Sequence, residues 1–103
     1  MKDLASGTSI KLTDGSSIKV KKELGRGGQG VVYLVDYNGK DMALKWYHNP
    51  PPMAFYQNLQ RNVDEGAPSS AFIWPKYLTA RGQYDSYGYV MDMRSNNYKE
   101  FGQ

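Results

Sequence analysis

Two dipeptides that favour tight turns divide the first half of the chain into segments that pair most readily as antiparallel neighbours. They are Asp14-Gly15, between the alternating stretches 9–13 and 17–21, and Asn38-Gly39, between 31–35 and 41–47. Glycine and asparagine accept the positive φ that two-residue hairpin turns need. The first half of the chain is therefore predicted to be an antiparallel sheet.

The second half carries one helix signal. Pro50-Pro51-Pro52 ends the run of strands, because proline offers no N–H donor to a strand ladder. Phe55, Leu59 and Val63 then recur every four residues with polar residues between them. This spacing predicts a helix over 53–65 whose Phe55, Leu59 and Val63 side chains pack on the sheet.

Strands are expected around 71–78 and 87–93, after the helix. Runs of strands with a single helix give an α+β fold, in which the helix covers one face of a twisted antiparallel sheet.

Composition excludes several classes of site and partner. The 103 residues include no cysteine and one histidine, which excludes disulfides, thiolate zinc sites and multi-histidine metal sites. A net charge of +3 is too small for a nucleic-acid surface, and no apolar run is long enough to span a membrane. We expect a cytoplasmic protein with no metal site of its own and no nucleic-acid or membrane partner.

The spacing Gly25-x-Gly27-x-x-Gly30 marks the end of the second predicted strand. A dinucleotide-binding fold needs a helix after such glycines, and a Walker loop needs Gly-Lys-Ser/Thr. Val31 to Val35 instead predict a strand. What remains is an ordinary turn or a glycine-rich turn whose backbone N–H groups approach a triphosphate without hindrance from a Cβ.

A glycine-rich turn of this kind needs a nearby cation, and Lys45 is the candidate. Lys45 lies fifteen residues after Gly30, on the strand predicted to pair with the one that leaves the turn. Alternation places Ala43 on the same face, and its small side chain leaves room for a flat ring.

These segments resemble the protein kinase family. Residues 24–33 match the family's Gly-x-Gly-x-x-Gly-x-Val loop, and Ala43-Leu44-Lys45 matches its Val-Ala-Ile-Lys strand. Residues 89–94 look like the strand that runs into the hinge between the two lobes of a kinase. More loosely, 46–48 and 72–75 are similar to bacterial Ser/Thr kinase-like proteins.

The resemblance implies ATP as the ligand and assigns roles along the chain. Leu24 and Val32 would cover the adenine, Ala43 would line its pocket, and Lys45 would bind the phosphates. Met91 would be the gatekeeper, with the backbone of Asp92 and Arg94 bonding the adenine edge. The full set implied to bind nucleotide is Leu24, Gly25, Gly27, Gly28, Gly30, Val32, Ala43, Lys45, Met91, Asp92 and Arg94.

The resemblance also implies a protein-kinase-like N-terminal lobe over 1–103, with about five strands, one extra N-terminal strand and one αC-like helix. Residues 1–17 would form the extra strand and turn, 18–94 the lobe proper, and 95–103 the start of a connection to a C-terminal lobe.

The helix departs from the kinase pattern. Kinases pair the strand lysine with a helix glutamate, but the acids of 53–65 are Asp64 and Glu65 at its far end. Gln60, or second Gln57, is the expected partner of Lys45. Glutamine can accept a hydrogen bond from an ammonium without neutralising it.

The sequence also lacks the His-Arg-Asp and Asp-Phe-Gly motifs that supply the catalytic base and hold Mg²⁺ in kinases. We expect an N-terminal lobe that is inactive by itself, either an excised fragment or a natural half, with Mg²⁺ and protein substrate held by a missing C-terminal lobe. The alternative is a degenerate lobe that serves as a protein-interaction module.

The face that meets a second lobe is expected to be exposed and apolar, and therefore to self-associate. His48 is expected to be a surface residue with no role.

Overall fold

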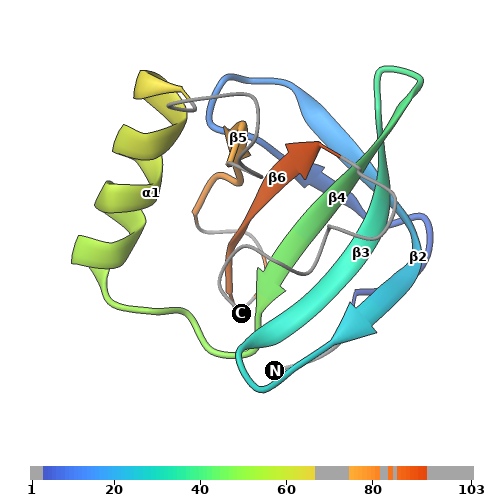
Figure 1. Ribbon diagram of the computed structural model, residues 1–103. Coiled ribbons are helices and arrows are strands. Elements are labelled where there is room, and N and C mark those ends of the chain that lie inside the picture. Colours follow the sequence, from blue (N-terminus) through green and yellow to red (C-terminus); the bar gives the residue numbers. More distant parts are fainter. Residues whose placement is uncertain (1–3, 67–74, 82–83, 85, 93–103) are drawn as a thin grey trace.

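The computed structural model describes residues 4–66, 75–81, 84 and 86–92. Six strands and one helix follow one another in these ranges (Figure 1). They are β1 (Ser9–Lys11), β2 (Ser17–Arg26), β3 (Gly30–Tyr37), β4 (Lys40–Tyr47), α1 (Met53–Glu65), β5 (Tyr77–Leu78) and β6 (Gly88–Asp92).

Both predicted hairpins are present. Ile10 faces Ile18 across β1 and β2, and Val32 faces Lys45 across β3 and β4. Asn38 and Gly39 have φ values of 51° and 88°, the positive values that a tight two-residue turn requires. The strand order is β1-β2-β3-β4-β6-β5, and every pairing is antiparallel.

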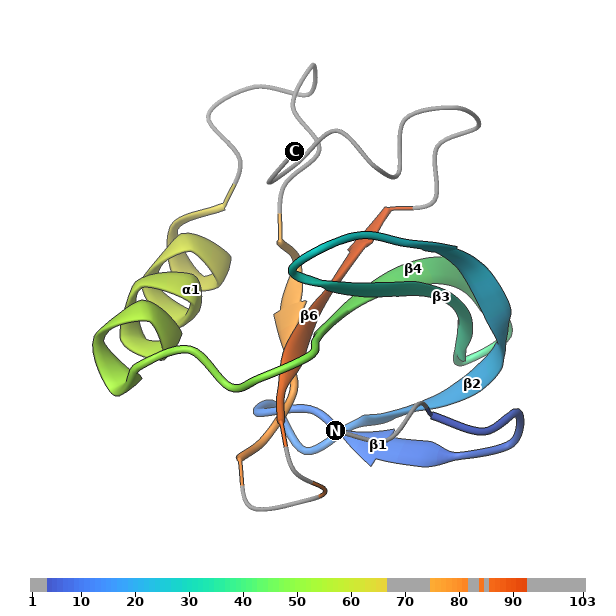
Figure 2. The same cartoon turned by 90° about the horizontal axis from the view of Figure 1, so that it is seen from below.

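The sheet curls so that its two edge strands, β1 and β5, approach each other (Figure 2). Leu12, just after β1, forms a β-bridge with Thr79, just after β5. The Thr13 N–H donates to the Leu78 carbonyl at 2.8 Å, and the Ala80 N–H donates to the Lys11 carbonyl at 2.8 Å. Backbone groups that an open edge would leave to solvent are therefore bonded within the chain.

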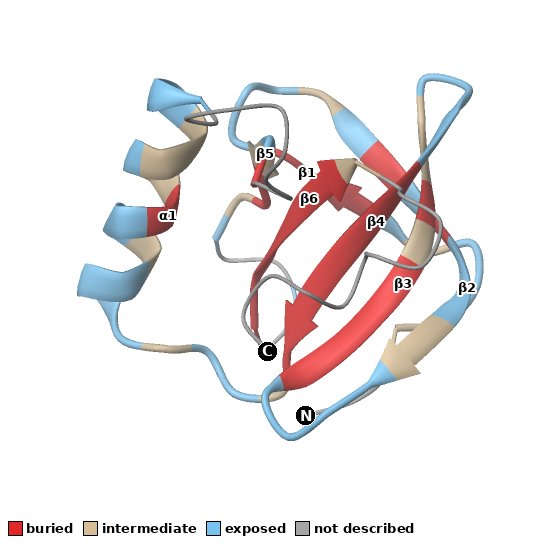
Figure 3. Ribbon diagram, in the orientation of Figure 1, coloured by how far each residue is buried: buried red, intermediate tan, exposed pale blue. Residues whose placement is uncertain are grey.

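The curled sheet has an inner and an outer apolar cluster. The inner cluster comprises Ile10, Leu12, Ile18, Val20, Val31, Tyr33, Val35, Met42, Leu44, Trp46 and Val90. The outer cluster, on the face toward α1, comprises Val32, Ala43, Tyr47, Leu59, Leu78, Tyr87, Tyr89 and Met91. The buried lengths of β3, β4 and β6 lie at the centre of the molecule (Figure 3). Because strand residues alternate between faces, neighbours such as Leu44 and Lys45 belong to different environments.

The helix has the predicted bounds, and Tyr56 joins its predicted packing residues. Leu59 is buried and Val63 packs partly against the outer cluster, whereas Phe55 is 39% exposed. Phe55 still contacts the sheet, because its ring meets the Tyr47 ring edge-on with the centroids 5.6 Å apart. Tyr56 packs against the outer cluster as well, and its hydroxyl donates to the Thr79 carbonyl at 2.9 Å. A strict four-residue repeat drifts by about 40° per step on a helix of 3.6 residues per turn, so Phe55 lies at the margin of the packed stripe.

Several strand bounds also differ from the prediction. β1 ends at Lys11, and β2 runs on to Arg26, so that Gly25 lies in a paired strand. Of the strand predicted over 71–78, residues 71–74 lie outside the described residues, and β5 begins at Tyr77. Among the described residues, no helix is long and apolar enough to cross a membrane.

Candidate functional site

Lys45 lies in the middle of the sheet. It faces Val32 of β3 on one side and Tyr89 of β6 on the other. Alternation along β4 puts Lys45 on the outer face with Ala43 and Tyr47, both members of the outer cluster. The predicted placement of Lys45 and Ala43 on one face is therefore found in the structure.

Lys45 is a buried cation in a mostly aromatic setting. Its residue is only 8% exposed, and burial lowers the pKa of its ammonium. The Nζ atom lies 5.8 Å from the centre of the Tyr47 ring, within range of a cation–π contact. In the part of the chain that the structure describes, no carboxylate pairs with this ammonium. An anion reaching Lys45 would therefore supply its counter-charge.

Two tyrosines beside Lys45 are held in the neutral form. Burial, with a smaller effect of Tyr87, raises the pKa of Tyr47 to about 12. Burial also raises the pKa of Tyr89, which is fully buried and faces Lys45 directly. The neighbourhood of Lys45 therefore contributes phenol rings rather than negative charge at neutral pH.

The residues implied to contact adenine lie together on the outer face. Val32, Ala43 and Met91 are members of the outer cluster, and Leu24 packs against it. The expectation that this face is exposed is wrong for its centre. Ala43 and Met91 are fully buried in the outer cluster, against which Leu24, Tyr56 and Val63 pack. A flat ring can reach Ala43 only if this packing opens.

The fold requires glycine at one position of the turn but not at two others. A Cβ at Gly30 would overlap the backbone carbonyl of Trp46 on the neighbouring strand, so the fold itself requires glycine there. A Cβ at Gly27 or Gly28 would meet open space, and neither residue has a left-handed φ. The structure of the chain alone therefore does not explain these two glycines, which leave the tip of the turn open to a ligand.

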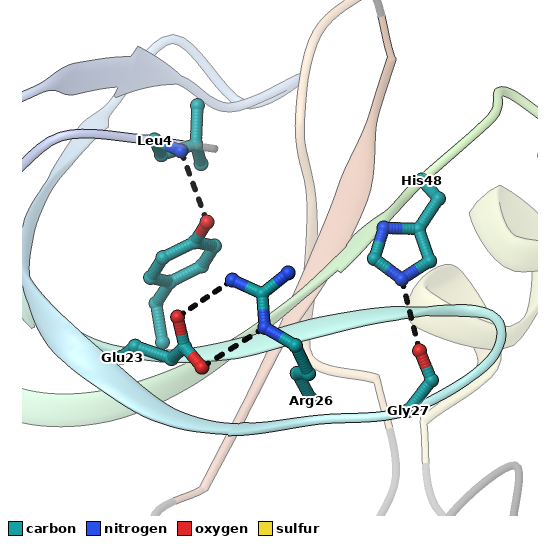
Figure 4. Close-up of polar contacts among 6 residues, drawn as sticks. Leu4, Glu23, Arg26, Gly27 and His48 are labelled. Atoms are coloured by element: carbon teal, nitrogen blue, oxygen red, sulfur yellow. Dashed lines mark hydrogen bonds and ion pairs between the residues drawn. The ribbon is translucent and has the colours of Figure 1, made fainter. Parts of the chain in front are cut away.

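The turn is held by polar contacts that the sequence analysis did not predict (Figure 4). Arg26, the last residue of β2, donates to the Glu23 carboxylate of the same strand at 2.8 and 3.2 Å, so its charge is compensated there. His48, expected to have no role, is partly buried and places its ring Nε2 2.9 Å from the Gly27 carbonyl oxygen. The hairpin register places His48 opposite Gln29, because each is nine residues from the Asn38-Gly39 turn, but it does not predict the contact of the ring with Gly27.

Asp92, one of the residues implied to form a hinge, is the last residue of β6. Asp92 faces Met42, and its carboxylate lies 3.2 Å from the Lys76 ammonium and 3.7 Å from that of Lys40. These ion pairs tie the end of β6 to the residues around it. Arg94, the other residue expected to bond the adenine edge, lies outside the described residues.

The helix glutamines contact neither Lys45 nor one another in the described structure. The Gln60 side-chain amide donates to Asp64 at 2.9 Å, and Gln57 is exposed. Leu59, between them in sequence, is the helix residue buried against the outer cluster. Among the described residues, no group of three or more histidine, aspartate or glutamate side chains is placed to hold a metal ion.

Comparison with known proteins shows the fold. No family model matches the chain, and no curated protein sequence matches it. A solved structure, described as the structure of vaccinia related kinase 3, superposes with a TM-score of 0.68 at 18% sequence identity. The match covers 90% of this chain and 32% of that one, so the chain spans about a third of the kinase. The predicted kinase-like α+β fold, a curled antiparallel sheet with one helix, is confirmed.

Proposed function

We propose that this chain is the ATP-binding N-terminal lobe of a cytoplasmic protein kinase of the bacterial Ser/Thr type. Its role is to hold the phosphates of ATP for transfer to a protein hydroxyl. The observation that carries the proposal is Lys45, a buried cation without a carboxylate partner among the described residues, on a kinase-like sheet next to a glycine-rich turn.

The residues present fit a nucleoside triphosphate. Lys45 offers the charge that phosphates need, and the backbone of Gly27 and Gly28 offers an approach without a Cβ. Gly25 pairs with Val32 near the end of β2, and Gly30 pairs with Tyr47 at the start of β3, so both flank the turn within the sheet. The chain thereby contributes positioning and electrostatic stabilisation.

The apolar residues Leu24, Val32, Ala43 and Met91 fit the adenine ring, and the Asp92 carbonyl and Arg94 N–H are proposed to bond its edge. Because Ala43 and Met91 are buried, binding includes the cost of opening the outer cluster. Affinity for ATP should therefore be weak, with a Kd on the order of 1 mM. Mg²⁺ and the catalytic base belong, on this proposal, to a C-terminal lobe, so the chain by itself transfers no phosphate.

A titration of the chain with ATP and Mg²⁺, followed by two-dimensional NMR, tests this proposal. We expect saturable shifts at Gly27, Gly28 and Lys45, and a loss of affinity of roughly tenfold or more in Lys45→Met, because a charge-assisted hydrogen bond is removed. Lys19→Met, at an exposed lysine of β2, is the matched control and should bind as the wild type does. A folded wild-type chain that shows no saturable shift would contradict ATP binding.

One observation favours the alternative, a degenerate lobe that acts as a protein-interaction module. Gln60 is bonded to Asp64, and the described part of the helix offers no carboxylate to Lys45. Without that partner, the lysine of a kinase is less firmly positioned. A well-folded chain that self-associates or binds a protein partner, and binds no nucleotide, would establish this alternative.

A further inference from the structure

His48, the residue that follows β4, contacts the tip of the glycine-rich turn at two points, of which Figure 4 shows the ring contact with Gly27. Its ring Nε2 lies 2.9 Å from the Gly27 carbonyl oxygen. Its backbone N–H donates to the Gln29 carbonyl at 2.9 Å. A carbonyl can only accept, so the ring nitrogen that faces Gly27 must carry the proton.

The ring contact fixes the orientation of one peptide group. The carbonyl of Gly27 and the N–H of Gly28 belong to the same peptide, which is trans, and in a trans peptide they point in opposite directions. With the carbonyl held by His48, the Gly28 N–H is directed away from the imidazole. Gly27 itself is anchored through its own N–H, which donates to the Gly30 carbonyl at 2.9 Å.

The tip therefore presents donors that the described chain does not use. The N–H groups of Gly28 and Gln29 have no acceptor among the described residues, and both residues are exposed. Successive unbonded backbone N–H groups are suited to bind the oxygens of a phosphate. A loop rich in glycine would otherwise sample many conformations, since glycine restricts φ and ψ least.

We infer that His48 is a positioning residue of the phosphate-binding turn: it holds the Gly27–Gly28 peptide so that the Gly28 N–H is preorganised for a phosphate oxygen. This inference rests on the proposed nucleotide binding and adds a residue to it. His48 acts through the backbone of the turn and has no contact with the phosphate in this assignment. Preorganisation lowers the entropy cost of binding, so its loss weakens binding without removing the charge at Lys45.

Two substitutions separate the hydrogen bond from the bulk of the ring. In His48→Gln the side-chain amide nitrogen can occupy the place of Nε2 and donate to Gly27. In His48→Asn the amide is one carbon shorter and cannot reach. Both variants keep a polar side chain and the backbone N–H that bonds Gln29, so their difference reports the bond to Gly27.

The first measurement is made without nucleotide, by ¹⁵N relaxation of the backbone. We expect order parameters at Gly28 and Gln29 near 0.8 in the wild type and in His48→Gln, and below about 0.6 in His48→Asn. The ¹⁵N shifts of the His48 ring should identify Nε2 as the protonated nitrogen. Equal order in all three proteins, or a proton on Nδ1 alone, would overturn the inference.

The second measurement is the Kd for ATP and Mg²⁺. His48→Asn loses the hydrogen bond that preorganises the turn, which should cost about 1 kcal/mol of binding free energy and weaken binding about fivefold. The Kd of His48→Gln should stay within about twofold of the wild-type value. Equal affinities despite a looser turn in His48→Asn would overturn the role in phosphate binding. If the wild type binds no ATP while the turn still loosens, the proposed function fails and the hold of His48 on the turn stands. Thermal unfolding of each variant confirms that the fold is retained.

Discussion

The inner and outer faces of the sheet are formed by the same strands but carry different kinds of side chain. The inner cluster consists of apolar and aromatic side chains, and its one hydroxyl, that of Tyr33, accepts a hydrogen bond from the Leu4 N–H at 2.9 Å. The outer face places the Lys45 ammonium among tyrosine rings, at a cost in solvation that lowers its pKa. Natural proteins retain such unfavourable charges mainly where function needs them. Both faces contain buried apolar side chains, but among the described residues only the outer face also carries a buried charge and with it the candidate site.

The largest expected change in the free energy of unfolding is at Leu44, on the inner face. Leu44 is fully buried, so Leu44→Ala should lower the free energy of unfolding by about 3 kcal/mol through lost burial and a residual cavity. Urea unfolding followed by tryptophan fluorescence measures the change. Leu34→Ala, at a half-buried position of β3, is the control and should cost about 1 kcal/mol. Equal losses for the two would remove the distinction between the environments.

The next largest effect is expected at Lys45 on the outer face, where a substitution should stabilise the fold. Lys45→Met keeps the length of the side chain and removes a charge that is buried without an acidic partner in the described structure. We expect the free energy of unfolding to rise by about 1 kcal/mol and Tm by roughly 4 °C, while the affinity for ATP falls roughly tenfold or more. Lys19→Met should change neither property. A fall in Tm for Lys45→Met would show that the ammonium stabilises the fold.

The outer face should also make the stability of the fold depend on pH in the alkaline range, through Tyr47. Its pKa in the folded protein is about 12, against an ordinary value of 10.0, because burial disfavours the phenolate. Stability that is present below pH 10 is therefore lost as the pH rises toward 12, since the unfolded chain releases this proton first.

Tyr47→Phe should flatten the decline of the unfolding free energy between pH 10 and 12 and leave stability at pH 7 within about 0.5 kcal/mol. Denaturant titrations at a series of pH values measure the slope. An unchanged slope in the variant would mean that Tyr47 ionises in the folded state as it does in the unfolded chain.

The smallest effect on stability is expected at the tip of the turn. A Cβ at Gly28 meets open space, so Gly28→Ala should change the free energy of unfolding by less than about 0.5 kcal/mol while weakening ATP binding. Gly30→Ala is the contrasting variant and should disrupt pairing with β4. Calorimetry for stability and NMR for binding separate the two. Strong destabilisation by Gly28→Ala would show that the fold, rather than a ligand, requires glycine at this position.

Much of the fold could be predicted because its signals are local. The turn dipeptides fix the hairpin registers, and those registers fix which residues share a face, including Val32 with Lys45. The bounds of α1 followed from the prolines before it and Gly66 after it. The helix face was predicted incompletely, because Tyr56 packs on the outer cluster in addition to Leu59 and Val63, while Phe55 contacts it through the Tyr47 ring.

By itself, then, the sequence determined the strands, their antiparallel pairing and the placement of Lys45 with Ala43 beside a glycine-rich turn, since period-two alternation and turn chemistry act between near neighbours. Only the tertiary structure decided that the sheet closes on itself between Leu12 and Thr79, and that the centre of the outer face is buried. The same holds for the ring of His48 on Gly27, because side-chain contacts across a sheet depend on curvature and rotamers that no local pattern encodes.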